Sequence, residues 1–507
     1  MRILISGCGL AGMTTAYWLH QFGFRPVIIE QAPALRRDGY GLDFFGTGYD
    51  VAERMGLIDT LAPQQIPAEY VAYVDENNTR IATLDMDLMR KVMHGKYIPL
   101  MHWTLEETLY NAIANDVDIR FGTTLTAVSQ TPDAVTVTFN DGASETFDLL
   151  IGADGAHSNT RKLVFGPEED YGRFLGYNVA CYALPDQYGV GHAWNNYTEP
   201  GRQAGVYCSD KPGELITLFM WETDNEAYVP PADRLETLRR AFEGMGWITP
   251  QLLADAPAAA DIFMDTVTQI QMPGWANGRV ALVGDAAYCL TLISGQGASM
   301  ALGGAYLLAA ALRDCPTYQD AFIHYEHQLR PHIEQRQDNA RDFAKSFVPG
   351  SELGLTVQKV MMKVILREAF TGVLRKQFGA DSVLQAQTLR RLPQSHGQVI
   401  GYALNGKLHD TDYQTLNLDV DNVLQTHDSV HLLLRLEDFA GIELRGLWDD
   451  LQFGREHGRD IGKLAIVGDG RWADWLAKAS RPFYAHEARH FPTADSAAAW
   501  DWVGSER

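Results

Sequence analysis

The first thirty residues constrain the fold of this chain more than any other stretch. A short apolar run, Arg2 to Ser6, leads into the turn Gly7-Cys8-Gly9-Leu10-Ala11-Gly12, which has the pattern G-x-G-x-x-G. Helix-forming residues follow from Met13 to Phe22, and a second apolar run then ends on Glu30. A strand, a glycine-rich turn, a helix and a second strand with a terminal acid form the β-α-β unit that binds dinucleotides.

Each part of this unit has a physical role. Gly7 permits the tight turn, Gly9 lets the backbone approach a pyrophosphate, and Gly12 lets the helix pack closely on the strand. The start of the helix presents free N–H groups and the positive end of its dipole to phosphates. Glu30 is placed to hydrogen-bond a ribose hydroxyl. An ordinary glycine-rich turn is the alternative interpretation, and the flanking elements disfavour it.

Length, charge and cysteine content narrow the class of protein. At 507 residues the chain is too long for one hydrophobic core, and about three domains are expected. The net charge of −22 disfavours a nucleic-acid surface, which needs clustered positive charge. The five cysteines contain no C-x-x-C pair, so neither a disulfide framework nor a metal site is predicted. Reduced cysteines, a chain that opens on a strand and the lack of a long apolar run predict a cytoplasmic protein without a signal peptide or transmembrane segment.

Two further stretches join an apolar strand to a turn of small residues and an acid. The first passes from a strand at 148–151 into Gly152-Ala153-Asp154-Gly155 and continues to Arg161. The second runs from a strand at 279–283 into Gly284-Asp285, and Gly295-Gln296-Gly297-Ala298 then opens a small-residue helix. An acid at a strand end can hold a sugar hydroxyl, and glycines at a helix start let N–H groups meet a ligand oxygen. Taken singly, each stretch is also an ordinary strand end followed by a helix.

Other segments carry weaker signals. Residues 171–270 have the pattern of a largely antiparallel region. Its aromatic residues are candidate substrate contacts, although aromatics that alternate in strands more often belong to a core: Tyr177, Phe219 and Trp221. The loop after Glu30 carries Arg36 and Arg37 among glycines, which suits either an anionic ligand or a solvated basic turn. Residues 355–378 predict a packed helix with a solvated basic face.

The three glycine-and-acid stretches together resemble the group A flavoprotein monooxygenases, the family of p-hydroxybenzoate hydroxylase and the tetracycline destructases. The resemblance covers roughly residues 1–375. It implies an α/β fold in which a Rossmann-like FAD-binding domain of the glutathione-reductase type carries a β-sheet substrate domain. It also implies FAD and NAD(P)H as cofactors. The positions that it assigns to cofactor binding are Gly7, Gly9, Leu10, Ala11, Gly12, Glu30, Arg37, His102, Asp154, Gly155, Arg161, Gly284, Asp285, Gly295, Gln296, Gly297 and Ala298.

The chain departs from the family pattern at four places. Tyr288 stands where the family usually has histidine, and Leu292 where it commonly has a proline beside the flavin ring. His102 replaces an arginine that opens a helix, and Ser299 replaces an asparagine. None of these changes removes FAD binding by itself. The loss of the proline leaves the shape of the oxygen pocket, and therefore hydroxylation, open.

The C-terminal part forms a separate unit. After a polar linker, the sequence from Val399 onward alternates strands with helices, which predicts a small, mostly parallel sheet covered by helices. Its opening, from Gly406-Lys407-Leu408 to Asp412-Tyr413, and the segment Trp448-Asp449-Asp450 resemble the SpoIIAA-like, STAS-type domains. The predicted boundaries are 1–170 with 272–345 for the FAD domain, 171–271 for the substrate domain, 346–380 for C-terminal helices, 381–396 for the linker and 397–507 for the STAS-type domain.

The resemblance implies an FAD-dependent monooxygenase. NAD(P)H would reduce the flavin, and a flavin hydroperoxide would pass one oxygen atom of O2 to an aromatic or polycyclic small molecule. The predicted catalytic residues are Arg37, beside flavin and substrate, and Tyr288 and Gln296, along the ring. Two alternatives stay open: a flavoprotein that reduces or dehydrogenates its substrate without inserting oxygen, and a flavin-loaded sensing or partner-binding protein whose C-terminal domain carries the output.

Overall fold

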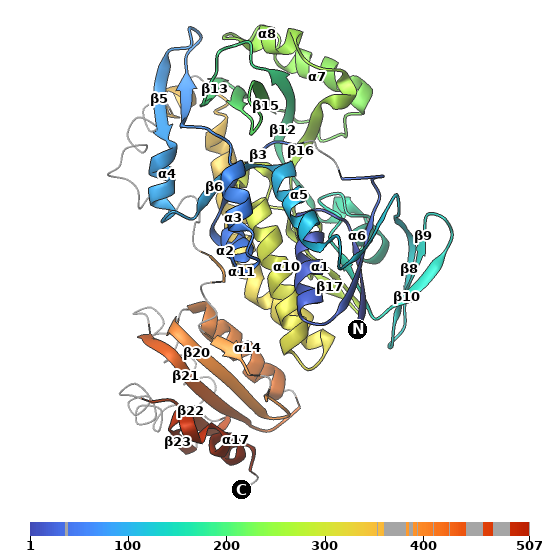
Figure 1. Cartoon of the computed structure of the whole chain (residues 1–507), viewed down its shortest axis with the longest axis vertical. Helices are drawn as coiled ribbons and strands as arrows, with labels where there is room; N and C mark the ends of the chain where they lie inside the picture. Colours follow the sequence, from blue (N-terminus) through green and yellow to red (C-terminus); the bar gives the residue numbers. More distant parts are fainter. Residues whose placement is uncertain are drawn as a thin grey trace. The chain divides into compact units, whose positions relative to one another are not determined.

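The structure, a computed structural model, describes residues 1–35, 39–351, 353–358, 382–384, 389–392, 394–408, 410–424, 426–442, 460–469 and 487–505. The chain divides into two compact units, Met1–Ala310 with Leu329–Ser382 and Ala311–Gln328 with Val383–Arg507 (Figure 1). Several predicted features lie outside the described residues: Arg36 and Arg37, the 355–378 helix beyond residue 358, and the segment 448–450. Within the described ranges, no helix is both long and apolar enough to cross a bilayer.

A six-stranded sheet in the order β17-β18-β11-β1-β2-β7 forms the centre of the first unit. The strands are β1 (Arg2–Ser6), β2 (Arg25–Glu30), β7 (Asp118–Phe121), β11 (Leu149–Gly152), β17 (Ala276–Asn277) and β18 (Val280–Leu282). β1 pairs in parallel with β2 and β11, and β11 pairs in parallel with β18. Parallel strands are buried on both faces, which is why these segments read as continuous apolar runs. Their carboxyl ends meet at one edge, and the three glycine-and-acid turns follow there.

Helices cover this sheet. α1 (Leu10–Gln21) contacts α5 (His102–Ile113), and the rings of Trp18 and Tyr306 meet edge to face at 4.9 Å between α1 and α10 (Gly297–Asp314). A three-stranded antiparallel sheet lies beside them, built from β8 (Leu125–Gln130), β9 (Val135–Phe139) and β10 (Ser144–Phe147). The other helices of this part are α2 (Gly46–Arg54), α3 (Ile58–Leu61), α4 (Met86–Val92), α6 (Asn159–Val164) and α9 (Asp285–Tyr288). The long helix α11 (Tyr318–Phe347) belongs to the second unit up to Gln328 and to the first unit from Leu329 onward.

A seven-stranded sheet forms a second layer of the first unit, in the order β16-β12-β15-β14-β13-β4-β5. Its strands are β4 (Tyr70–Val74), β5 (Arg80–Asp85), β12 (Gly172–Pro185), β13 (Ala193–Glu199), β14 (Arg202–Cys208), β15 (Glu214–Glu222) and β16 (Phe263–Ile270). The sheet therefore extends beyond the predicted 171–271 segment, because β4 pairs in parallel with β13. That pairing joins residues more than a hundred positions apart, and local sequence patterns do not reveal it.

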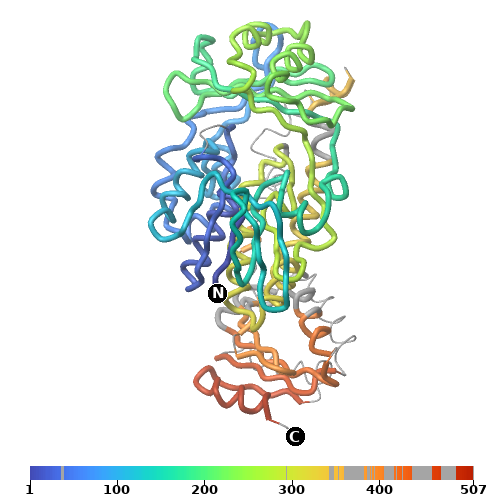
Figure 2. Tube along the Cα trace, turned by 90° about the vertical axis from the view of Figure 1, so that its right-hand side faces the viewer, coloured from blue at the N-terminus to red at the C-terminus, as the bar shows by residue number. Residues whose placement is uncertain are grey.

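The two faces of the seven-stranded sheet have different partners. One face packs a large apolar core against α7 (Arg234–Ala241) and α8 (Thr249–Ala254), which Figures 1 and 2 show covering it. Phe219 and Trp221 belong to this core, and Tyr177 is buried near Val348 in another cluster. The other face turns towards the two-stranded sheet of β3 (Gly41–Phe45) and β6 (Tyr97–Met101). Phe219 and Trp221 are thus core residues whose strand neighbours Leu218 and Met220 line the cavity. Tyr177 is buried on the cavity side of the sheet, in a cluster with Val179 and Met220, but is not part of the lining.

The second unit holds a five-stranded sheet in the order β19-β20-β21-β22-β23. Its strands are β19 (Leu389–Arg391), β20 (Val399–Leu408), β21 (Val430–Ile442), β22 (Ile461–Val467) and β23 (Glu487–Phe491). All neighbouring pairs except β19–β20 are parallel. The helices α14 (Asp410–Leu424) and α17 (Ser496–Gly504) connect or follow these strands, and apolar clusters lie on both faces. This is the small parallel sheet that the sequence predicted.

Replacing a core aromatic should test the layer assignment of the seven-stranded sheet. Phe219 is 0% exposed, stacks on Tyr182 at 5.6 Å and meets Phe242 edge to face at 4.9 Å. We expect Phe219→Ala to lower the free energy of unfolding by about 3–5 kcal/mol, because a cavity replaces the ring. Urea unfolding followed by tryptophan fluorescence measures the loss. The control, Tyr228→Ala at a side chain 70% exposed, should change stability by about 0.5 kcal/mol or less, and an equal loss in both would contradict the assignment.

Candidate active site

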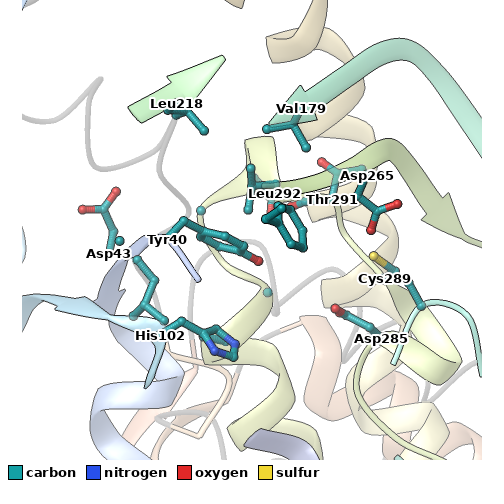
Figure 3. A pocket seen from close by; sticks show the side chains of 18 of the residues that line it. Tyr40, Asp43, His102, Val179, Leu218, Asp265, Asp285, Cys289, Thr291 and Leu292 are labelled. Carbon is teal, nitrogen blue, oxygen red and sulfur yellow. The ribbon is translucent and has the colours of Figure 1, made fainter. Parts of the chain in front are cut away.

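A single cavity of about 1160 Å³ runs through the first unit. It begins at the carboxyl ends of β1, β2 and β11 and extends below the inner face of the seven-stranded sheet. Figure 3 shows its middle, where Val179 and Leu218 lie above and His102 and Asp285 below. Pockets for one drug-sized ligand measure about 300–1,000 Å³, so this volume exceeds the usual range for a single small ligand.

The glycines of the first turn have two different roles, close packing of the backbone and access of a ligand to it. Gly7 has φ +109°, and a Cβ there would lie 2.4 Å from the oxygen of Ala153. A Cβ on Gly12 would lie 2.0 Å from the oxygen of Gly7, so these two glycines allow close packing. A Cβ on Gly9 would meet only Glu106, at 4.0 Å, and Gly9 lines the cavity. The division agrees with the roles predicted from the sequence.

The start of α1 is open to an anion. Gly9 is its N-cap, no side chain caps the first turn, and Leu10 and Ala11 line the cavity. Uncapped N–H groups at a helix start attract phosphate oxygens. Glu30 also lines the cavity and braces the turn, because its carboxylate accepts hydrogen bonds from Cys8 N at 3.0 Å and Ala32 N at 2.8 Å.

The Asp154 carboxylate holds the second turn in place. It accepts hydrogen bonds from Thr160 N and Thr160 Oγ1, both at 2.8 Å, and from the Ser158 hydroxyl. Asp154 and Gly155 line the cavity, and a Cβ on Gly155, where φ is +79°, would meet nothing within 4 Å. The turn therefore presents its backbone to the cavity while the acid keeps its shape.

Arg161 supports the site from behind. Its side chain is 0% exposed and is not part of the cavity lining. The guanidinium donates to Ala286 O at 3.0 Å and to Glu168 Oε2 at 2.8 Å, which ties the second turn to α9. Burial lowers its pKa. The guanidinium therefore does not border the cavity, where the predicted contact with the cofactor would lie.

The third turn brings Asp285 to the cavity. Gly284 has φ +66°, and a Cβ there would lie 2.7 Å from the Ala11 methyl group, so α1 and α9 pack closely. Asp285 lines the cavity opposite His102 (Figure 3). Burial raises the pKa of Asp285, and His102 acts in the opposite direction. Nδ1 of His102 also lies 3.6 Å from the Glu106 carboxylate.

The predicted ring-side residues fall into two groups. Gly295, Gly297 and Ala298 line the cavity. Gln296 turns away, and its Oε1 accepts a hydrogen bond at 2.6 Å from Nε of Arg336, a buried residue of α11. Tyr288 also lies outside the lining, with its ring 4.6 Å from that of Trp275. Contacts with Trp275 and Arg336 hold the side chains of Tyr288 and Gln296 away from the cavity.

The structure adds lining residues that the sequence did not single out: Tyr40, Asp43, Cys289 and Thr291. Asp43 accepts a hydrogen bond from the Tyr97 hydroxyl, and burial raises the pKa of its carboxyl. Leu292, the family's proline position, lines the cavity beside Thr291 (Figure 3). Thr291 has φ +89°, a conformation rare outside glycine, and nothing in the sequence predicts it. An acid in an otherwise apolar strand, as at Asp43, is the one signal that was available.

Comparison with known proteins finds relatives of both parts of the chain. Residues 1–340 match the family model described as FAD binding domain, and residues 399–504 match the SpoIIAA-like model. A flavin-dependent monooxygenase from an unknown prokaryotic organism is 32% identical over 351 residues, which cover 69% of this chain and 90% of that protein. Tetracycline destructase Tet(55) aligns with a TM-score of 0.65 and 29% identity, over 75% of this chain and 97% of its own.

The chain belongs to the FAD-dependent monooxygenases. It carries a C-terminal SpoIIAA-like domain, and the family and fold predicted from the sequence are confirmed. HpxO from Klebsiella pneumoniae, in complex with FAD and uric acid, shares the fold with a TM-score of 0.64 and 21% identity, over 75% of this chain and 97% of that one. The uncapped start of α1 and the open faces of Gly9 and Gly297 fit FAD, since they leave room where a side chain would stand.

A side chain added at Gly297 should compete with FAD. A Cβ at Gly297 would meet nothing within 4 Å in the protein, so the fold of this monooxygenase should tolerate valine there. We expect Gly297→Val to weaken FAD binding by about tenfold or more, because the side chain occupies cofactor space. Flavin fluorescence titration of the apoprotein measures the affinity. Gly274→Val is the control, because a Cβ there is equally unhindered and lies outside the cavity lining. Equal affinities in both variants would contradict the placement of FAD.

An ion-pair cluster links the second turn to the substrate sheet of the monooxygenase. His157 lies 2.8 Å from Glu168 and 3.4 Å from Asp265 of β16. Hydrogen bonds to Asp265 and Glu168 raise the pKa of His157 to about 10. An unfolded histidine titrates near 6.5, at about the ordinary pKa. The cluster should therefore stabilise the fold fully below about pH 6.5, and progressively less as the pH rises towards 10.

His157→Gln should expose this dependence on pH. We expect the variant to lose about 1 kcal/mol at pH 6, a modest value because solvent screens a side chain that is 59% exposed. The difference from the unmodified protein should shrink as the pH rises from 7 to 10. Urea unfolding at a series of pH values measures both free energies. A difference that stays constant over that range would show that the charge of His157 does not contribute.

Proposed function

We propose that this monooxygenase consumes NAD(P)H and inserts one oxygen atom of O2 into a neutral aromatic or polycyclic small molecule. The single observation that carries the proposal is the continuity of the cavity. One space connects the dinucleotide end, at Gly9 and Glu30, with an apolar chamber at Val179 and Leu218. A substrate in the chamber would lie next to the redox end of a cofactor anchored at the three turns.

Different residues would bind the two ends of the cofactor within the cavity. Gly9, Glu30 and Asp285 would hold the phosphate and sugar parts of FAD. At the other end, Met300 makes the first bond of α10, to Gln296 O at 2.9 Å, so the N–H groups of Gly297 and Ala298 precede the helical ladder. These N–H groups would stabilise negative charge on the reduced flavin ring. Gly295 contributes shape, because its N–H already donates to Leu292 O at 3.1 Å.

The bound FAD supplies the redox chemistry, taking two electrons from NAD(P)H and activating O2. The chain would exclude water from the reaction site and position the substrate. Leu218, Met220 and Phe263 line the chamber, and the sheet above them would exclude water, which would limit the loss of activated oxygen as hydrogen peroxide. The apolar lining supports an aromatic or polycyclic substrate, and so does the similarity to a tetracycline destructase.

The purified FAD-loaded enzyme tests the proposal directly. We expect anaerobic NAD(P)H to bleach the flavin, and ¹⁸O-labelled dioxygen in the presence of a substrate to give a product heavier by one labelled oxygen atom. Spectrophotometry and mass spectrometry follow the two steps. NAD(P)H oxidation that returns all of the oxygen as free hydrogen peroxide, with every aromatic and polycyclic compound tested, would contradict oxygen insertion. That outcome would support the alternative of an oxidoreductase without oxygenation, which the substitution at Leu292 motivates.

The SpoIIAA-like domain supports a second, separate role. Its described sheet has its own apolar clusters, and the residues that line the cavity all belong to the first unit. We therefore propose that this domain binds a protein partner and contributes nothing to the chemistry. A chain that ends before residue 396 should keep its FAD content and its rate of NAD(P)H oxidation. A loss of turnover at full FAD content would contradict this division.

A further inference from the structure

Two polar side chains lie next to each other in the roof of the chamber. Tyr73 on β4 and Asn196 on β13 are direct register partners, and both line the cavity. Neighbouring strands lie about 4.8 Å apart, so the two side chains leave the sheet side by side. The residues next to them along the strands, Ala72 and Tyr197, belong to the core on the other face. The sheet therefore directs this pair into the chamber.

The hydrogen bonds of Asn196 fix the orientation of its amide. Trp194 Nε1 donates to Asn196 Oδ1 at 3.1 Å, and Gln203 Nε2 donates to the same oxygen at 3.4 Å. An indole N–H can only donate, so the oxygen must face Trp194 and the NH2 group must point the other way. Gly205 is the register partner on the opposite side, and a Cβ there would lie 2.7 Å from Oδ1. Glycine at this position makes room for the amide oxygen.

The recorded hydrogen bonds of Asn196 all go to its oxygen, and the amide nitrogen makes none with the described residues. The residue is 4% exposed, and the nitrogen is not among the fully buried unpaired atoms, so it keeps some access to open space. A donor that a ligand buries without giving it a partner costs about 1–3 kcal/mol. The NH2 group borders the cavity, which is the remaining direction in which a partner can lie. The protein thus holds two N–H donors at the chamber wall.

Tyr73 offers a third donor. Its hydroxyl makes no hydrogen bond within the described part of the chain, and burial alone raises its pKa to about 12. No charged group contributes to that shift, so the phenol stays neutral and its O–H is a donor in apolar surroundings. Val71, Leu84 and Met220 complete this part of the lining.

Charge around the cavity favours a neutral ligand. The described lining residues include no lysine or arginine, whereas Asp43, Asp265 and Asp285 all border the chamber (Figure 3). His157 also lines the cavity, but it is already paired with Glu168 and Asp265. A carboxylate or phenolate bound there would therefore meet Asp43 and Asp285 without a free lysine or arginine among the described residues, at a cost that grows in a dry site. A carbonyl oxygen carries two lone pairs and no charge, which matches neighbouring N–H and O–H donors.

We propose that Asn196 and Tyr73 form a subsite that binds the carbonyl oxygen of a neutral, planar, polycyclic substrate. The inference rests on the proposed function, because it names the substrate class of the same chamber. Within that class it assigns specificity to the two side chains. A site built to donate hydrogen bonds rejects analogues that lack the acceptor, because its buried donors are then left unpaired.

Paired ligands and paired variants test the subsite. The probes are 9-fluorenone and fluorene, two neutral planar tricyclic molecules of which only the first has a carbonyl group. Calorimetric titration of the FAD-loaded enzyme, without NAD(P)H, measures both affinities. We expect 9-fluorenone to bind about tenfold more tightly than fluorene. Tyr73→Phe should weaken 9-fluorenone about threefold to tenfold and leave fluorene unchanged.

Asn196→Asp removes the other donor with almost no change of shape. The aspartate keeps an oxygen for Trp194 and Gln203 and replaces the NH2 group by a second oxygen. The change should weaken the binding of 9-fluorenone by about tenfold or more, since an aspartate oxygen then faces the carbonyl oxygen of the ligand and both are acceptors. Tyr70→Phe is the control, because Tyr70 lies on the same strand and is not part of the cavity lining. It should leave both affinities unchanged.

Several results would overturn the subsite. The subsite is ruled out if the unmodified enzyme binds the two probes with equal affinity or binds neither. It is also ruled out if Tyr73→Phe weakens both probes equally. FAD content and thermal unfolding of every variant show that it is folded, and Tyr73→Phe suffices if Asn196→Asp does not fold. Binding is measured without turnover. A failure of oxygen insertion therefore leaves this result unaffected, and the two proposals fail separately.

Discussion

The parallel pairing of four strands is the constraint on which the site depends. β2, β1, β11 and β18 lie side by side in one direction, so the turns that follow three of them open at the same edge of the sheet. Close packing keeps these turns together. Gly7 abuts the Ala153 carbonyl and Gly284 abuts the Ala11 methyl group, and a larger side chain at either glycine would separate two of the turns.

The charged residues around the cofactor end act mainly on the protein. Asp154 orders its own turn through hydrogen bonds to Ser158 and Thr160, and Glu30 braces the first turn through Cys8. Arg161 joins the second turn to the third from a fully buried position. Rigid turns present their backbone N–H groups to a ligand without further ordering, which is how preorganised sites gain affinity. We therefore propose that Asp154 and Arg161 support FAD binding through the shape that they impose, whereas Glu30 both braces its turn and borders the space for the cofactor.

Below the seven-stranded sheet, the alternation of side chains along each strand decides which residues line the cavity. Successive side chains of a strand point to opposite faces, so a shift of one residue exchanges the core for the chamber. Phe219 and Trp221 lie in the core, whereas Leu218 and Met220 line the chamber. The same alternation brings Asn196 and Tyr73 to the cavity and Ala193 and Ala72 to the core. Which of two adjacent residues lines the cavity is therefore a property of the whole sheet.

The sequence by itself determined the cofactor, the family and the two-part architecture, because glycine turns and strand-end acids act locally and keep a recognisable spacing. It also anticipated which glycines pack and which give access. Tyr288 packs on Trp275, outside the cavity lining. Only the tertiary structure decided that Gln296 and Arg161 turn away from the cavity, since their partners Arg336 and Ala286 lie 40 and 125 residues away along the chain. It likewise decided that β4 joins β13 and places Tyr73 beside Asn196. Such contacts join residues that are distant in sequence, and no local pattern encodes them.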